Sequence, residues 1–223
     1  MKEDTSPQGV HYFSLLALAF VWGSSFILMR IGLRGFEGAP VFDSFQVAAL
    51  RMFLAGMFLL PIAIKHFKKL SKRQLLWCAV VGSFGNLIPA FLFTSAQTDL
   101  DSSIAGILNS LTPVFALILA MIVFKVKFRN IQLIGLALGL LGAIGLISLK
   151  DGAGDFLFWP SAKVVFATLC YAISLNVIRN MLSEVHPVHI AAISLGMISI
   201  PCGVLLLGMD LESVFLQSEE ALS

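Results

Sequence analysis

Apolar residues in this chain gather into seven long runs, separated by short segments that hold most of the charged residues. The runs cover residues 13–33, 45–64, 74–95, 103–124, 131–149, 160–181 and 188–208. A helix needs about 20 mainly apolar residues to cross a bilayer, and each run has roughly that length. Helices are expected because a helix pairs its backbone polar groups internally, whereas an open strand in lipid leaves them unpaired. The pattern therefore predicts an all-α membrane protein, a polytopic bundle of seven transmembrane helices.

The composition supports membrane insertion. Hydrophobic residues make up 58% of the chain, charged residues only 13%, and the mean hydropathy is +0.92. A soluble domain carries about 25% charged residues. The first run is longer than the apolar part of a typical signal peptide and lacks a cleavage site of small residues, so we interpret it as a retained helix.

The charges between the runs alternate in sign. Basic residues follow the second and fourth runs: Lys65, Lys68, Lys69, Lys72, Arg73, Lys125, Lys127 and Arg129. Acidic residues occupy the alternate connections: Glu37, Asp43, Asp99, Asp101, Asp151 and Asp155. Lys and Arg favour cytoplasmic loops. We therefore expect a multi-pass protein of the cell (plasma or inner) membrane with its N-terminus in the cytoplasm.

Two weak internal matches suggest a repeat. The segment from Trp22 to Arg30 recurs loosely from Tyr171 to Arg179, and the second run also finds an echo in the seventh. The sixth run would then restart the first. Because five spans are an odd number, the second copy must enter from the opposite face, as in the inverted repeats of secondary transporters.

The repeat gives the expected domain organisation. Residues 1–12 form a cytoplasmic segment, 13–149 a first repeat, 150–159 an external loop, 160–208 the start of a second repeat, and 209–223 a polar external tail. Two complete repeats would contain ten helices, so we expect a truncated sequence. A genuine seven-helix protein is the alternative.

Several segments resemble the EamA-type proteins of the drug/metabolite transporter superfamily. They are Phe20-Val21-Trp22-Gly23-Ser24-Ser25-Phe26, Leu50-Arg51-Met52-Phe53-Leu54-Ala55, Leu111-Thr112-Pro113-Val114-Phe115 and Gln132-Leu133-Ile134-Gly135. The family often has a Gly-Glu-Arg-like turn after its fourth helix, where this chain has Lys125-Val126-Lys127. The resemblance implies export or exchange of small metabolites or drugs by alternating access.

Arg51 is the most informative single residue. It lies about two turns into the second run, a depth of roughly 10 Å. A charged side chain at that depth is costly unless it faces a cavity, finds a partner or reaches the headgroups. It could bind an anionic or zwitterionic substrate, or it could be a structural arginine that reaches headgroups or helix-end carbonyls. Arg30 lies nearer the end of its run and is interpreted as a structural arginine whose side chain reaches the headgroups.

Other polar residues are candidates to line a substrate cavity. Trp22, Ser25 and Met29 share one helix face. Asn86 lies near a helix proline, and Asn109 and Thr112 lie near another; proline frees a carbonyl one turn earlier, which polar neighbours can satisfy or present to a substrate. The candidate substrate-binding residues are thus Trp22, Ser25, Arg51, Asn86, Asn109 and Thr112. Gly135, Gly139 and Gly142 are instead expected to permit tight helix packing.

Residue types and motifs that are missing from the sequence limit its possible functions. All 13 acidic residues lie outside the predicted spans, so a proton relay through an intramembrane carboxylate is unsupported. We expect no enzyme activity, no metal site and no cofactor, because phosphate loops, nucleophile motifs and histidine boxes are missing from the sequence, and His186 and His189 are too few for a metal site. The expected partners are a small molecule and the lipid bilayer, with no nucleic acid, and a homodimer is left open. The alternative to transport is a noncatalytic assembly or signalling role for the same fold.

Overall fold

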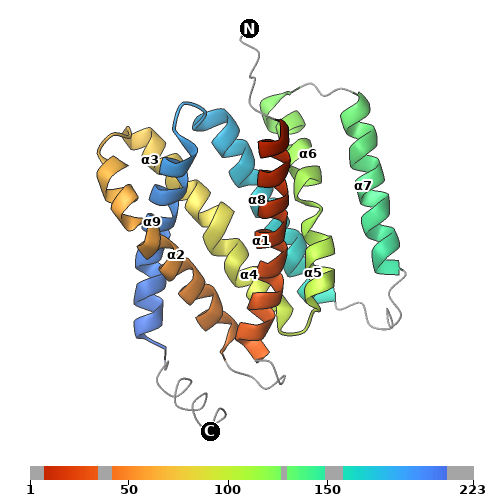
Figure 1. The fold of residues 1–223 in the computed structure, drawn as a ribbon, viewed down its shortest axis with the longest axis horizontal. Helices are drawn as coiled ribbons and strands as arrows, with labels where there is room; N and C mark the ends of the chain where they lie inside the picture. The colour runs from red at the N-terminus through yellow and green to blue at the C-terminus, as the bar shows by residue number, and fades with distance from the viewer. Residues whose placement is uncertain (1–7, 35–41, 127–129, 149–157, 210–223) are drawn as a thin grey trace.

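The computed structural model describes residues 8–34, 42–126, 130–148 and 158–209, and these residues are almost entirely helical (Figure 1). The helices, in chain order, are α1 (Gln8–Arg34), α2 (Ser44–Phe67), α3 (Lys72–Gly82), η1 (Ser83–Leu87), α4 (Ile88–Gln97), α5 (Ser102–Asn109), α6 (Thr112–Phe124), α7 (Asn130–Ser148), α8 (Phe158–Met181) and α9 (Pro187–Leu207). An all-α polytopic membrane protein is therefore confirmed.

Six spans within the described residues are long and apolar enough to cross a membrane. Two of them are composite. α3, the π-helical turn η1 and α4 form one span over residues 72–97, whereas α5 and α6 form another, broken at residues 110–111. α7 coincides with the fifth apolar run but is not among the six. The domain boundaries drawn from the sequence stay predictions.

Two helices begin where their sequences carry a capping box. The side chain of Asp43 accepts a hydrogen bond from the backbone at the start of α2, and the Gln46 side-chain oxygen accepts one from the Asp43 amide. Ser71 and Gln74 make the same exchange at the start of α3. Each box satisfies helix-end donors that would otherwise lack partners, and so fixes where the helix starts.

The helices run up and down, so their connections lie at two opposite ends of the bundle (Figure 1). The start of α1, the α2–α3 connection and the α8–α9 connection share one end, which we call the basic end. The α4–α5 connection and the end of α9 lie at the other, which we call the acidic end. This arrangement agrees with the alternation of charged connections in the sequence.

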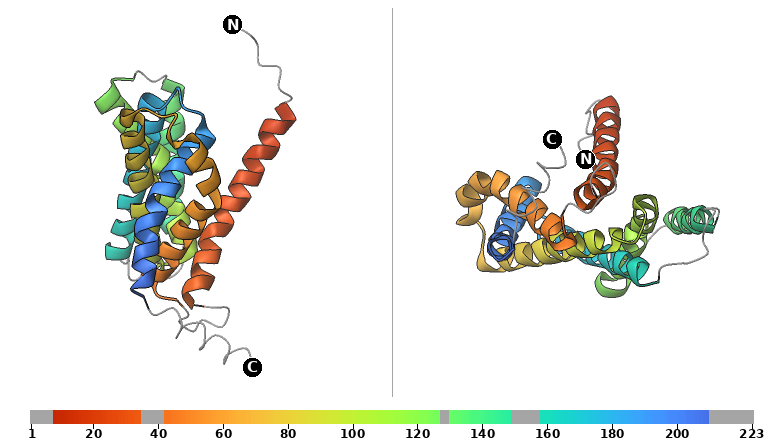
Figure 2. Two further views of the ribbon diagram at one scale, coloured as in Figure 1. Left: turned by 90° about the vertical axis from the view of Figure 1, so that its left-hand side faces the viewer. Right: turned by 90° about the horizontal axis from the view of Figure 1, so that it is seen from below.

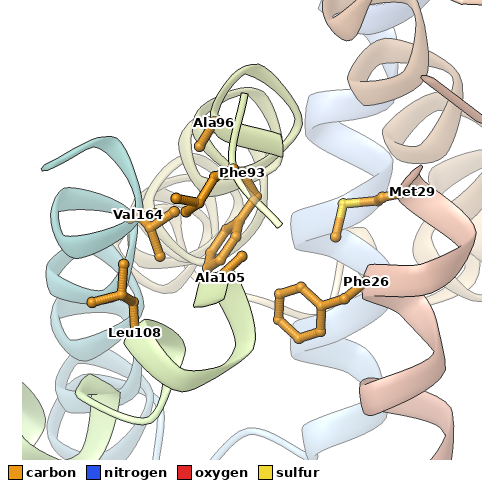
Figure 3. Close-up of a cluster of buried hydrophobic side chains, with 9 residues drawn as sticks. Phe26, Met29, Phe93, Ala96, Ala105, Leu108 and Val164 are labelled. Atoms are coloured by element: carbon orange, nitrogen blue, oxygen red, sulfur yellow. The ribbon is translucent and has the colours of Figure 1, made fainter. Parts of the chain in front are cut away.

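The core is built around α8 and around the pairing of α2 with α9. α8 packs against α3, α4, α5 and α6, and α2 makes its largest contact with α9. One cluster of buried side chains joins α1 to α4, α5 and α8 through Phe26, Phe93 and Val164 (Figure 3). α1 packs less closely and diverges from the bundle toward its N-terminal end (Figure 2).

The expectation for the glycines of α7 is wrong. A Cβ added at Gly135, Gly139 or Gly142 would meet nothing within 4 Å. The close contacts are made elsewhere, because α7 has few neighbours. A Cβ at Gly56 on α2 would overlap Ser199 on α9, and one at Gly82 on α3 would lie 2.8 Å from the Ser194 carbonyl oxygen.

Candidate functional site

A central cavity of about 270 Å³ lies between α1, α2, the η1–α4 segment and α8. Its walls hold one charged side chain, Arg51, and the polar side chains of Ser25, Asn86 and Tyr171. The other lining residues are apolar or aromatic: Leu18, Val21, Trp22, Phe26, Met29, Met52, Ala90 and Phe93. A partly open cavity of this type, mostly apolar with a few convergent polar groups, is typical of a small-molecule site.

Arg51 enters this cavity from α2. Its side chain is half-buried, and Nη1 contacts the Met29 sulfur, which is a weak acceptor. Among the residues that the structure describes, Arg51 makes no ion pair with a carboxylate. The guanidinium keeps its charge at physiological pH and offers five donors. Most of this donor capacity therefore remains available to a molecule in the cavity.

Trp22 occupies a junction, because it lines three cavities at once. Ser25, one turn later on the same face, donates its hydroxyl hydrogen to the Trp22 carbonyl oxygen at 2.6 Å. The Ser25 oxygen can therefore act toward a ligand chiefly as an acceptor. The sequence placed Trp22, Ser25 and Met29 on one face, and the structure places all three on the central cavity.

A second cavity, of about 280 Å³, continues from the central one toward the basic end. It is lined by α8 and by Pro187, Ile190 and Ala191 at the start of α9. Trp22, Asn86 and Tyr171 line both cavities. The two chambers therefore meet at these three side chains.

The aromatic rings at this boundary contact one another. The rings of Trp22 and Tyr171 lie edge to face, with centroids 6.4 Å apart. Tyr171 also packs on Phe93, at 5.9 Å, and Phe93 packs on Phe26, at 5.6 Å. Such pairs stabilise their mutual geometry by about 0.5–1.5 kcal/mol beyond area burial. The rings thus form a continuous aromatic wall from α1 to α8.

Asn86 lies in the π-helical turn η1, three residues before Pro89. Turns of this kind inside α-helices are frequent at functional sites, because they re-aim side chains. The neighbouring Gly85 is required sterically, since a Cβ there would overlap the Ser174 hydroxyl on α8. The turn therefore brings η1 against α8 and places Asn86 at the boundary between the two chambers.

Asn109 and Thr112 lie apart from the central cavity. They line a wide opening of about 830 Å³ between α1 and the broken α5–α6 span. The Thr112 hydroxyl donates to the Asn109 carbonyl oxygen at 2.8 Å, so the carbonyl near the Pro113 break is satisfied locally. Thr112 also reaches the second cavity, whereas Asn109 lines only the wide opening among the cavities described here.

Tyr171 is the site residue that sequence reasoning missed. A signal for it was present, because the weak internal repeat pairs Tyr171 with Trp22. The two paired positions turn out to be in contact. A tyrosine within an apolar run gave no separate reason to select it.

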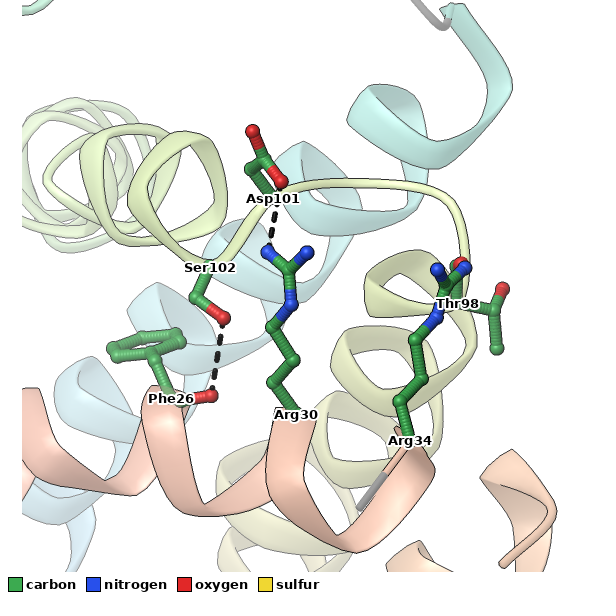
Figure 4. A network of polar contacts seen from close by, with 6 residues as sticks. All are labelled: Phe26, Arg30, Arg34, Thr98, Asp101 and Ser102. Atoms are coloured by element: carbon green, nitrogen blue, oxygen red, sulfur yellow. Dashed lines mark hydrogen bonds and ion pairs between the residues drawn. The ribbon is translucent and has the colours of Figure 1, made fainter. Parts of the chain in front are cut away.

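The acidic end is held together by polar contacts between α1 and the α4–α5 connection (Figure 4). Arg30 Nη1 lies 2.8 Å from Asp101 Oδ1, and Arg34 donates to the Thr98 carbonyl oxygen. The Ser102 hydroxyl donates to the Phe26 carbonyl oxygen at 3.3 Å. Arg30 therefore pairs with a protein carboxylate. The sequence had suggested that it only reaches the lipid headgroups.

Three histidines gather at the basic end. His66 and His189 stack with ring centroids 3.7 Å apart, and His186 lies 5.2 Å from His189. His186 also caps α9, accepting from the Val188 amide. No group of residues in the described part of the chain has the geometry to hold a metal ion.

Residues 10–148 match the EamA-like transporter family. An uncharacterized inner membrane transporter, YedA of Escherichia coli, is 28% identical over 71% of this chain and 50% of its own length. An uncharacterized transporter of Archaeoglobus fulgidus is 24% identical, over 81% of this chain and 61% of its own. Protein PagO of Salmonella typhimurium is 26% identical, over 71% of this chain and 51% of its own. The chain thus spans about half the length of the curated relatives, and no solved structure is significantly similar to it.

Proposed function

This chain belongs to the EamA-like transporter family, and we propose that it acts in a secondary transporter of small metabolites or drugs. The observation that carries the proposal is the position of Arg51. Within the described residues, it places a cation without an ion-pair partner on a cavity between four helical segments, a costly arrangement in a membrane that binding of an anionic ligand would offset. The absence of a catalytic set in the sequence, together with the family, favours transport over chemistry.

The lining of the central cavity supports an anionic or zwitterionic substrate. The Arg51 guanidinium can bind a carboxylate through two parallel hydrogen bonds. Asn86 supplies both donors and acceptors, while Trp22, Phe26 and Phe93 offer apolar faces. The volume of about 270 Å³ suits a small molecule. Arg51 would orient the charged end, and the aromatic wall would contact the rest.

The two chambers support alternating access. The Trp22–Tyr171 contact separates the Arg51 chamber from the second cavity, which extends toward the basic end. The Arg30–Asp101 pair joins α1 to the α4–α5 connection at the acidic end. Rocking of α1 would break either the Trp22–Tyr171 contact or the Arg30–Asp101 pair while the other is preserved. α1 suits this motion because it packs less closely than its neighbours.

The basic end is the cytoplasmic end in this proposal, and the N-terminus is therefore cytoplasmic. Lys68 and Lys69 are exposed there, in the short connection between α2 and α3, and Lys72 is exposed at the start of α3. The rule that Lys and Arg collect on the cytoplasmic side supports this orientation. The second cavity would then extend toward the cytoplasm.

The proposal is tested by asking whether water and substrate reach the cavity. Asn86→Cys should react with a small water-soluble thiol reagent in membrane vesicles, and an anionic substrate should protect it. Ile122→Cys, on the exposed face of α6, is the matched control and should stay unreactive because it faces lipid. Radiolabelled amino acids, monocarboxylates and organic cations form the substrate panel for flux. An unreactive Asn86→Cys would indicate a packed, dry interior and favour an assembly role.

A further inference from the structure

A separate groove lies on the side of the bundle between α2 and α9, near the basic end. Its volume is about 290 Å³, and it shares no lining residue with the cavities described above. Leu60, Ile64 and Phe67 form its wall on α2, while Gly196 and Ile200 belong to its α9 side. All of its lining side chains are apolar except that of Lys68.

The groove is shaped to follow the two helices. A Cβ added at Gly196 would lie 3.2 Å from the Ala63 Cβ, so small residues let α2 and α9 approach closely at this level. The stripe from Leu60 to Phe67 extends along α2 for roughly 10 Å, at 1.5 Å per residue. This is a large part of the depth of one leaflet, whose hydrocarbon is about 15 Å thick. The groove therefore runs inward from Lys68 in the direction of a lipid chain.

The mouth of the groove is positively charged. Lys68 lines it, and both Lys65, three residues earlier in α2, and Lys69, the next residue, are exposed. Within the described residues, none of the three lysines forms an ion pair. Ile64 and Ile200, in contrast, are 67% and 69% exposed, so the apolar part of the groove opens directly to the bilayer.

We propose that this groove binds an anionic phospholipid, with one acyl chain between α2 and α9 and the phosphate at Lys68. Basic side chains next to a membrane helix attract anionic lipids through charge complementarity. The same charges disfavour a second copy of the chain as the occupant. A two-fold interface would bring the same lysines of both copies together, and like charges across an interface oppose association.

Native mass spectrometry tests the proposal. The purified full chain is mixed with equal amounts of phosphatidylglycerol and phosphatidylcholine that carry identical acyl chains. Wild type should retain phosphatidylglycerol selectively. Lys68→Gln should lower that retention about fivefold, because a lysine near an anionic lipid is worth about 1 kcal/mol. Ile200→Trp should lower it by a similar factor by filling the groove.

Two matched control variants distinguish lipid binding in this groove from nonspecific effects of a lost charge or an added bulky side chain. Lys72→Gln removes an exposed lysine of the same end that does not line the groove, and Val204→Trp places the same side chain one turn farther along α9. Both should retain the lipid as wild type does, and gel filtration checks that every variant is folded. If Ile200→Trp is not folded, the exposed-site variant Lys68→Glu replaces it and should lower phosphatidylglycerol retention by reversing the charge at the mouth of the groove. Equal retention of the two lipids, equal losses in Lys68→Gln and Lys72→Gln, or a dimer that Ile200→Trp dissociates would each overturn the proposal.

Discussion

Trp22 and Tyr171 meet edge to face where the two inner chambers join, with ring centroids 6.4 Å apart and ring planes at 73°. The sequence comparison pairs these same residues as equivalent positions of a weak repeat. They lie on α1 and α8, which run in opposite directions through the bundle (Figure 1). The contact therefore joins the two segments that an inverted repeat would relate.

The first prediction concerns this contact. Trp22→Ala should make transport leaky, so that substrate runs down its gradient without exchange, because the two chambers would then be open to each other. Tyr171→Phe keeps the ring and should change flux less than twofold. Efflux from preloaded vesicles, with and without substrate outside, measures both effects. Unaltered exchange in Trp22→Ala would show that the rings are not a barrier.

The second prediction concerns Arg51. Arg51→Lys should raise the KM for an anionic substrate about tenfold, because lysine cannot form the two parallel bonds of a guanidinium. The loss corresponds to roughly 1.5 kcal/mol, the lower range for a hydrogen bond to a charged group. Arg51→Gln should weaken binding further while membrane insertion is retained. Initial rates of uptake over a range of concentrations give the values.

A matched arginine controls for the charge itself. Arg179 is exposed in the last turn of α8 and lines none of the cavities described here. Arg179→Lys should leave the KM unchanged. An equal KM in wild type, Arg51→Lys and Arg51→Gln would assign Arg51 a structural role.

The third prediction concerns the Arg30–Asp101 ion pair. Both side chains are 47% exposed, so solvent screens the attraction and the pair should contribute only about 0.2–1 kcal/mol. A double-mutant cycle with Arg30→Gln and Asp101→Asn, followed by unfolding in detergent, isolates the coupling energy from other contacts of either residue. The coupling should fall as salt is added. A larger, salt-independent value would indicate a buried pair.

The fourth prediction concerns helix packing. Gly56→Ala should destabilise the fold by about 1–3 kcal/mol, because its Cβ would overlap Ser199 and crowd the Leu195 carbonyl oxygen on α9. Gly139→Ala on α7 has free space around the added methyl and should be neutral or slightly stabilising. Thermal unfolding of the two variants in one detergent compares them directly. Equal losses of stability would contradict the packing of α2 on α9.

The fifth prediction concerns orientation. Lys69→Cys at the basic end should be protected from a membrane-impermeant thiol reagent added outside intact cells. Asp99→Cys at the acidic end should be labelled. Both positions are exposed and lie outside the capping boxes, and Cys78, Cys170 and Cys202 are buried in the bundle. The reverse labelling pattern would place the N-terminus outside.

The sequence was a good guide to the elements and a partial guide to the site. Trp22 and Ser25 were selected together as one helix face, Arg51 and Asn86 were selected separately, and the structure brings all four to one cavity. Each is a polar, charged or aromatic residue within an apolar run, so the sequence alone is enough to recognise it as a candidate. Asn109 was selected by the same reasoning but lies on a different opening, because the break between α5 and α6 turns it toward α1 and not toward Arg51.

The prediction of helix packing was wrong where it depended on glycine spacing alone. The glycines of α7 have the spacing of a contact face, yet no helix covers them in the described structure. Gly56 and Gly85, without any repeated pattern, make the closest approaches. Spacing shows which residues share a face of one helix, and says nothing about whether another helix lies against that face.

The sequence by itself determined membrane insertion, the helical spans and the separation of basic from acidic connections. Each of these depends on local sums over about 20 residues or on the charge of a short loop, and the bilayer responds to those sums. Only the tertiary structure decided that Tyr171 lines the Arg51 cavity in contact with Trp22 and that Arg30 pairs with Asp101. The physical reason is that lipid tails are as apolar as the helix faces. Hydrophobicity alone therefore does not choose among faces, and helices pair through shape and a few polar contacts.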